Sequence, residues 1–207
     1  MDLDQLAIQY GTDKSSNCHD YCRTYQDYFQ YRRLDKLKIL ELGVQSGISL
    51  QMWADYFPNS HIYGVDIIPV ELSHDRITVL QGDSSDRVFL SELSKTGFDI
   101  IIDDASHINS HQIIAFDVLF TTMSPGGIYV VEDLHTSYHP LGIWRDIPGQ
   151  TALDYFKNLV DEVNFKDQDT QGIGNYKMVP GFETSSELRK AIRSIHFYKS
   201  IAFILKH

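Results

Sequence analysis

The fold can be inferred from Ile39-Leu-Glu41-Leu-Gly43-Val-Gln-Ser-Gly47-Ile-Ser-Leu50, an apolar run followed by a turn with two glycines and the start of a helix. Glycine lets the backbone approach a ligand closely and adopt dihedral angles that other residues resist. The spacing differs from the G-x-G-x-x-G of dinucleotide-binding folds, and an acid, Glu41, stands just before the turn. A carboxylate there opposes a pyrophosphate and suits a cationic ligand. We therefore expect a buried strand, a ligand-binding turn and a helix.

From residue 37 onward, short apolar runs alternate with amphipathic segments, which is the pattern of βαβ units. Continuous β-branched runs such as Ile100-Ile101-Ile102 suit strands that are covered on both faces. Two apolar runs at the C-terminus are joined by a tight turn, which predicts an antiparallel hairpin. The expected parallel strands are 38–42, 61–66, 77–81, 98–103 and 127–132, the expected helices lie near 49–57, 85–95, 108–121 and 151–164, and the hairpin strands are 195–198 and 201–205.

This order of elements predicts an α/β, Rossmann-like sheet of seven strands, with five parallel strands, a C-terminal antiparallel hairpin and helices on both faces. It is the layout of class I S-adenosylmethionine (SAM) methyltransferases, although a fold alone does not define a function. The 207 residues predict one domain, 1–207, with an N-terminal helical cap over 1–36 and a catalytic core over 37–207.

Composition narrows the choice of partners and location. A formal net charge of −10 argues against a nucleic-acid partner, whose phosphates are bound by Lys and Arg. No apolar run reaches the ~18 residues of a membrane span, and the N-terminus lacks a secretory signal, so we expect a cytoplasmic protein. Cys18 and Cys22 stand four residues apart on an expected helix, which favours reduced thiols over a disulfide.

The N-terminal segment 6–31 is rich in tyrosine at helical spacing and is expected to be a helix packed over the sheet. Its motif Tyr10-Gly-Thr12-Asp-Lys14 presents a hydroxyl, a carboxylate and an ammonium, and we expect this turn to cap a ligand pocket.

Two further strand ends complete the expected cofactor site. Asp66 ends the second strand, where an acid commonly accepts hydrogen bonds from ribose hydroxyls. Gly82-Asp83-Ser84 follows the third strand, where methyltransferases often place an adenine contact. The alternative is that the glycines serve turns only and that Asp66 caps a helix. The candidate SAM-binding residues are Thr12, Lys14, Glu41, Gly43, Gly47, Asp66, Gly82, Asp83, Ser84 and Asp103.

Two acidic pairs, Asp103-Asp104 and Glu132-Asp133, close the fourth and fifth expected strands. Carboxylates brought together at one sheet edge repel unless a positive charge lies between them. A hard divalent cation, Mg²⁺ or Mn²⁺, is the simplest such charge. Side chains alternate along a strand, which separates Asp103 from Asp104. The candidate metal ligands are therefore Asp104, Glu132 and Asp133.

His107 lies three residues beyond Asp104 and is the candidate general base, with His135 as the rival. A metal would lower the pKa of a bound hydroxyl, and the base would take its proton before the oxygen attacks the SAM methyl group. The loop over 134–149 is long and carries Tyr138 and Trp144. We expect it to be a lid or binding loop, or else a surface loop with one Trp packed in the core.

Several segments together resemble the catalytic domain of metal-dependent sugar O-methyltransferases, the macrolide-sugar enzymes in particular. They are Tyr10–Lys14, Glu41–Gly47, Met52-Trp53, Tyr56-Phe57-Pro58, Ile102–Asn109, Gly126-Gly127, Glu132–Thr136 and His196–Ser200. The resemblance covers most of residues 5–207. It implies Mg²⁺ on Asp104, Glu132 and Asp133, His107 as general base, Glu41 and Asp66 on SAM, and a small-molecule sugar or glycoside as acceptor.

Two departures limit what the resemblance implies. Ala105 replaces the usual Gly of Asp-Asp-Gly-Ser-His, a small change expected to leave metal binding intact. The macrolide enzymes also carry an additional N-terminal domain, so acceptor specificity and oligomer contacts do not transfer, and a homo-oligomer stays open. The alternatives are a catechol or phenolic-diol O-methyltransferase, a catalytically inactive SAM-binding protein and a hydroxylase-like relative. A hydroxylase would need a redox-active metal with imidazole ligands, whereas the acid-rich site favours a hard cation.

Overall fold

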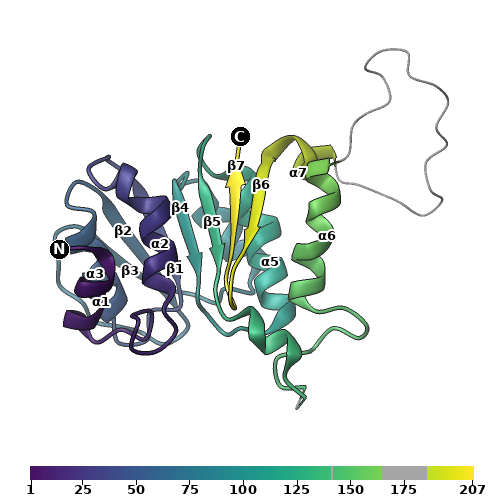
Figure 1. Cartoon of the computed structure of the whole chain (residues 1–207), viewed down its shortest axis with the longest axis horizontal. Coiled ribbons are helices and arrows are strands. Elements are labelled where there is room, and N and C mark those ends of the chain that lie inside the picture. The colour runs from purple at the N-terminus through teal and green to yellow at the C-terminus, as the bar shows by residue number, and fades with distance from the viewer. Residues whose placement is uncertain (141, 165–185) are drawn as a thin grey trace.

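The computed structural model describes residues 1–140, 142–164 and 186–207. Within them, seven strands form one sheet in the order β3-β2-β1-β4-β5-β7-β6 (Figure 1). Strands β1 to β5 pair in parallel, whereas β7 is antiparallel to both β5 and β6. The predicted fold is confirmed. The strands are β1 Lys38–Leu42, β2 His61–Asp66, β3 Ile77–Gln81, β4 Ile100–Asp103, β5 Ile128–Val131, β6 Ile192–Phe197 and β7 Ala202–Lys206.

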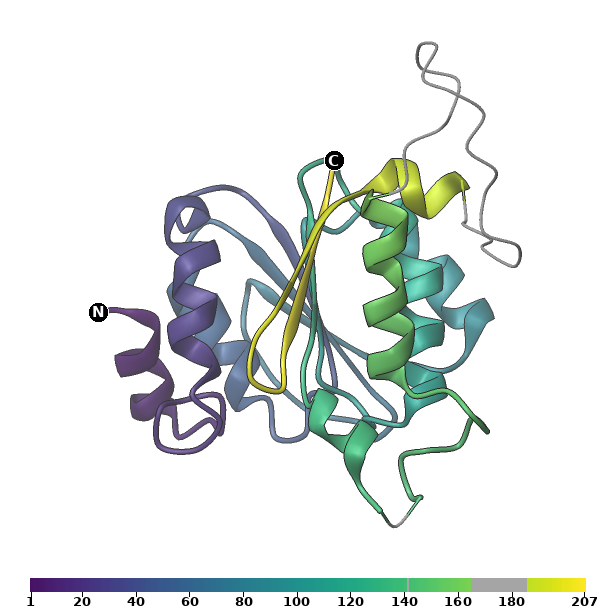
Figure 2. The same cartoon turned by 45° about the vertical axis from the view of Figure 1, so that its right-hand side comes forward.

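Helices cover both faces of the sheet (Figure 2). Side chains alternate across each strand, so that Ile39 and Ile102 pack into one core while Leu40 and Ile101 pack into the other. The first core is covered by α1 Leu3–Tyr10, α2 Tyr21–Phe29 and α3 Ile48–Tyr56, and the second by α4 Arg87–Ser94, α5 Asn109–Leu119 and α6 Ala152–Asn164. The short elements are η1 Gln30–Arg32, η2 Phe120–Thr122, η3 Leu134–Tyr138 and α7 Ser186–Ala191.

The N-terminal segment is not one continuous helix, which corrects the expectation for residues 6–31. Helix α1 ends at Tyr10 because Gly11 takes a left-handed φ of +76° and its N–H bonds back to Ala7 and Ile8. The chain then forms a loop over residues 11–20 before α2 begins. Cys18 therefore lies in a loop rather than on a helix, while Cys22 is buried in α2, and both thiols are free as predicted.

The parallel register brings the ends of β1 to β5 to one edge of the sheet. The turn after β1 packs directly against the loop after β4, since a Cβ built on Gly43 would lie 2.2 Å from the carbonyl oxygen of Asp104. Gly43 also has a φ of +91°, so both its conformation and its surroundings require glycine. Among the described helices, none is long and apolar enough to span a membrane.

Candidate active site

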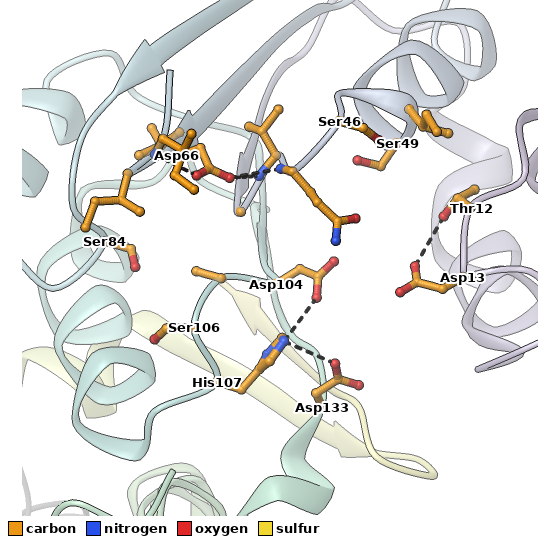
Figure 3. A pocket seen from close by; sticks show the side chains of 18 of the residues that line it. Thr12, Asp13, Ser46, Ser49, Asp66, Ser84, Asp104, Ser106, His107 and Asp133 are labelled. Atoms are coloured by element: carbon orange, nitrogen blue, oxygen red, sulfur yellow. Dashed lines mark hydrogen bonds and ion pairs between the residues drawn. The ribbon is translucent and has the colours of Figure 1, made fainter. Parts of the chain in front are cut away.

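A cavity of about 630 Å³ opens over this edge of the sheet (Figure 3). It is lined by the loop 11–14, by the turn after β1 and by the residues that follow β2, β3, β4 and β5. A volume of this size is in the usual range for a small-molecule site, about 300–1,000 Å³. The cavity walls include the predicted residues Thr12, Lys14, Gly43, Asp66, Gly82, Asp83, Ser84, Asp104, His107 and Asp133.

At one end, Asp66 fixes the glycine turn. One carboxylate oxygen accepts the backbone N–H groups of Val44 and Gln45 at 2.8 and 2.9 Å, and the other accepts that of Ile68 at 2.9 Å. Burial acts to raise the pKa of Asp66, but these backbone hydrogen bonds outweigh it and the pKa lies below its usual value. An ionised carboxylate with fixed geometry thus faces the cavity, and remaining lone pairs can accept ligand hydroxyls.

Asp83 and Ser84 also line the cavity, and they follow the end of β3, where Gln81 pairs with Asp66 of β2. The Asp83 carboxylate accepts the backbone N–H and the hydroxyl of Ser85, and these bonds hold the pKa of Asp83 below its usual value. The preceding Gly82 packs against the ring of Phe89, because a Cβ there would lie 2.2 Å from a ring carbon. Two ionised carboxylates, Asp66 and Asp83, therefore face this end.

The other end holds a compact group of three titratable side chains, Asp104, His107 and Asp133. Their potential ligand atoms all lie within 4.8 Å of one another. The Nε2 atom of His107 is 3.4 Å from Asp133 Oδ2 and 3.9 Å from Asp104 Oδ1 (Figure 3). His107 and Asp133 both adopt left-handed backbone conformations, with φ of 56°. Non-glycine residues rarely do so, and such positions are common at functional sites.

Lys14 brings a positive charge into the carboxylates beneath this group. Its Nζ contacts Asp104 Oδ2, lies 2.8 Å from Glu132 Oε2 and lies 3.4 Å from Glu41 Oε1. Burial acts to lower the pKa of Lys14, but the three carboxylates outweigh it and raise the pKa well above its usual value. Burial and the charge of Asp104 raise the pKa of Glu132 well above its usual range. The charge and the hydrogen bond of Lys14 act in the opposite direction and favour the ionised carboxylate.

Two tyrosines of α2 donate hydrogen bonds to Asp133 and Glu132, and the sequence analysis did not predict these contacts. The Tyr21 hydroxyl donates to Asp133 at 2.6 Å, and the Tyr25 hydroxyl donates to Glu132 at 2.5 Å. Their spacing of four residues predicts the packing face of a helix. The same spacing places both hydroxyls over the ends of the strands, so a pair of tyrosines facing two consecutive acids was the available signal.

Some predicted residues lie away from the cavity wall. Asp103 is buried on the face of the sheet covered by α4 to α6, where Tyr129 donates to it at 3.2 Å, and its contact with SAM stays a prediction. Burial raises the pKa of Asp103 to about 7. Glu41 is fully buried behind the wall, where the hydroxyl of Ser49 donates to it at 2.7 Å. Gly47 is the N-cap of α3 and also lies outside the lining.

The two candidate bases occupy different places. His107 lines the main cavity, and its Nδ1 is buried without a hydrogen-bond partner among the described residues. His135 lines a second cavity of about 370 Å³, and its Nδ1 lies 2.6 Å from the hydroxyl of Ser200. The structure therefore places His107, and not His135, in the cavity that also contains Asp104.

The segment 134–149 begins with the short helix η3, and its residues Trp144 and Asp146 accept hydrogen bonds from the start of α5. The Trp144 carbonyl accepts the backbone N–H of Asn109 at 2.8 Å, and the Trp144 ring packs against His139. Tyr138 is exposed and lines the second cavity. Leu141 lies outside the described residues. A lid role for this segment stays a prediction.

A parallel sheet completed by an antiparallel hairpin, with a cavity over the carboxyl ends of its strands, defines a class I methyltransferase domain. Comparison with known proteins agrees. A family model described as a methyltransferase domain matches residues 40–134. These residues therefore match a methyltransferase domain, and the relatives to which the chain is similar are sugar O-methyltransferases.

Three relatives illustrate that similarity. The chain is 34% identical over 218 residues to the 8-demethyl-8-(2-methoxy-alpha-L-rhamnosyl)-tetracenomycin-C 3'-O-methyltransferase of Streptomyces olivaceus, covering 99% of the chain and 54% of the relative. It is 35% identical to the demethylmacrocin O-methyltransferase of Streptomyces fradiae, covering 99% and 53%. The solved structure of the MycE methyltransferase from the mycinamycin biosynthetic pathway, in complex with Mg, SAH and mycinamycin VI, superposes with a TM-score of 0.83 at 32% identity, covering 100% and 54%. The chain thus spans about half the length of the relatives it matches.

Proposed function

We propose that the chain is the catalytic domain of a SAM- and Mg²⁺-dependent O-methyltransferase that methylates a hydroxyl of a sugar or glycoside. The observation that carries the proposal is that one cavity joins a cofactor-type end, with Asp66 and Asp83, to the cluster of Asp104, His107 and Asp133. The relative from Streptomyces olivaceus supports the acceptor class, because it is named for O-methylation of a rhamnosyl-tetracenomycin. This name favours a sugar over a catechol, the alternative left open by the sequence.

The cofactor end suits SAM by its chemistry. Asp66 would accept the ribose hydroxyls, and the turn at Gly43 allows close approach of the ligand to the backbone. The carboxylates of this end also favour a cationic sulfonium over a phosphate. Asp83 and Ser84 would contact the adenine.

The residues at the other end fit a hard divalent cation. Asp104 and Asp133 offer carboxylate oxygens within the 4.8 Å group, and Mg²⁺ prefers oxygen ligands and keeps several waters. Glu132 would be a third ligand if Lys14 released it. Bound Mg²⁺ would lower the pKa of an acceptor hydroxyl.

His107 would take the proton of the acceptor hydroxyl at Nε2. The imidazolium that forms would be stabilised by Asp133 at 3.4 Å and Asp104 at 3.9 Å. The acceptor oxygen then forms a bond to the methyl carbon while the carbon–sulfur bond of SAM breaks, which releases S-adenosylhomocysteine (SAH). The presence of His107 among the carboxylates favours an active enzyme over an inactive SAM-binding protein.

Calorimetric titration of SAH and then MgCl₂ into chelator-treated protein tests the proposal. We expect both to bind to the wild type. Asp104→Asn should weaken Mg²⁺ binding about 10-fold or more while SAH binding is retained, because it removes a charged ligand. Asp83→Asn is the matched variant at the other end and should show the opposite pattern. Equal effects of the two variants on both ligands, or no SAH binding to the wild type, would refute the proposed division of the cavity.

A further inference from the structure

Lys14 is the most deeply buried charged group of the N-terminal segment, with 1% of its side chain exposed. Its ammonium meets carboxylates from three places in the sheet, namely Glu41 in β1, Asp104 after β4 and Glu132 after β5. These residues are separated from Lys14 by 27 to 118 positions in the sequence, and the cluster forms only when the N-terminal segment docks on the sheet.

The loop that carries Lys14 is fixed by its own hydrogen bonds. The Lys14 carbonyl accepts the N–H of Cys22 at 2.9 Å, and its N–H donates to the hydroxyl of Thr12 at 3.2 Å. The next turn is fixed by Asp4, which accepts the N–H of Ser16 at 2.7 Å. The loop that carries Lys14 is therefore anchored to both α1 and α2, and this fixes the backbone position from which the side chain reaches the cluster.

Without Lys14, the cluster would hold three carboxyl groups with no positive charge paired to all of them. Glu41 and Glu132 are each at most 2% exposed, so water cannot screen their repulsion from each other or from Asp104. The hydroxyls of Ser49 and Tyr25 donate to Glu41 and Glu132 but bring no charge. Among the described residues, Lys14 is the cation that the ion pairs place against all three carboxylates.

We propose that Lys14 is a positioning residue of the methyltransferase site, the internal counter-ion that holds Glu41, Asp104 and Glu132 in one cluster. This inference rests on the proposed function, because it takes the cavity to be the methyltransferase site. The ammonium and a divalent cation then share Asp104 as a ligand, so the two cations compete for the same negative charge. Removal of the ammonium should lower the stability of the metal-free protein and increase the stabilisation that Mg²⁺ provides.

Thermal unfolding of Lys14→Met at pH 8, in chelator and then with MgCl₂, tests the inference. In chelator, the melting temperature should fall by about 10 °C, because one partner of a buried ion cluster has been removed. Added MgCl₂ should raise the melting temperature of the variant by more than that of the wild type. Lys14→Gln, which can still donate hydrogen bonds but carries no charge, is the milder variant and should show the same excess response. Lys14→Arg keeps the charge and should respond as the wild type does.

Lys206→Met is the matched control. Its ammonium donates to the carbonyls of Thr121 and Met123 at 2.6 Å, and no ion pair joins it to a carboxylate in the part of the chain that the structure describes, so its loss should not change the Mg²⁺ response. A fall in stability of the Lys14 variants without an excess Mg²⁺ response would overturn the inference, since a packing role alone gives that result. The SAH titration of the wild type tests the proposed function separately, because that binding does not depend on the comparison of Lys14 variants.

Discussion

Replacement of Gly43 by alanine tests how the turn after β1 and the loop after β4 are held together. Gly43 has a φ of +91°, and its N–H donates to the carbonyl of Val65 at 2.8 Å. A Cβ on this residue would lie 2.2 Å from the Asp104 carbonyl oxygen and 2.8 Å from the Ala105 Cα. Both neighbours are backbone atoms, which cannot rotate away, so the loop after β4 must move.

The expected cost has two parts. A non-glycine residue in a left-handed conformation costs about 1–2 kcal/mol. Overpacking against a fixed backbone adds about 1–3 kcal/mol, and a displacement of more than 1 Å is needed to restore ordinary contact at 3.4 Å. A total of about 2–5 kcal/mol lowers the melting temperature of a domain of this size by roughly 4–20 °C. The same displacement moves Asp104, and a shift of 1 Å at a catalytic site can cost about 100-fold in rate.

Thermal unfolding and calorimetric titration of SAH and Mg²⁺ measure both consequences. Gly97→Ala is the matched control, because Gly97 also has a positive φ, +67°, but an added Cβ would meet nothing within 4 Å. We expect Gly97→Ala to lose only the stability that a left-handed non-glycine residue costs, about 1–2 kcal/mol, and to keep its affinities for SAH and Mg²⁺. If Gly43→Ala loses no more stability than Gly97→Ala and binds both ligands normally, the close approach of the two loops is not what shapes the cavity.

Two further substitutions test the titratable groups of the cavity. His107→Gln should reduce the rate of methyl transfer about 10²–10⁴-fold with SAH and Mg²⁺ affinities retained, and His135→Gln should have a small effect; the reverse result would assign the base to His135. Because the pKa of Asp66 lies below its usual value in the folded protein, its carboxylate stabilises the fold above the unfolded-state pKa of about 3.9, and this contribution is lost as the pH falls through the lower folded-state value. Asp66→Asn should therefore lower the melting temperature at pH 7, and the difference from the wild type should narrow below about pH 4; a difference independent of pH would contradict the assignment.

The strands and the edge where the cavity lies could be predicted because both follow from local patterns. Continuous β-branched runs identified the buried strands, and parallel pairing brought their ends together. Alternation along β4 also separated Asp103 from Asp104 correctly, and the structure places Asp103 against Tyr129 on the opposite face. The same alternation places the Asp103 side chain outside the cavity lining, so its expected contact with SAM has no support from the position of this residue.

The N-terminal segment was harder to predict, because its conformation and its contacts depend on different things. The break after Tyr10 had a local signal in Gly11, which the helical spacing of the tyrosines outweighed in the expectation for residues 6–31. The contacts of Lys14 had no local signal in the sequence, since its partners lie 27, 90 and 118 residues away. Periodicity describes which face of an element is buried, but it does not say which distant charge that face will meet.

The acidic pairs predict a positive charge between them, but they do not distinguish one cation from two. The structure shows that Lys14 supplies one positive charge to Glu41, Asp104 and Glu132. Asp133 lies beyond its ion pairs and faces His107 instead. Tyr21 and Tyr25 donate hydrogen bonds to Asp133 and Glu132 but bring no charge. A divalent cation at Asp104 and Asp133 would be a second positive charge in the site, and it would compete with Lys14 for Asp104.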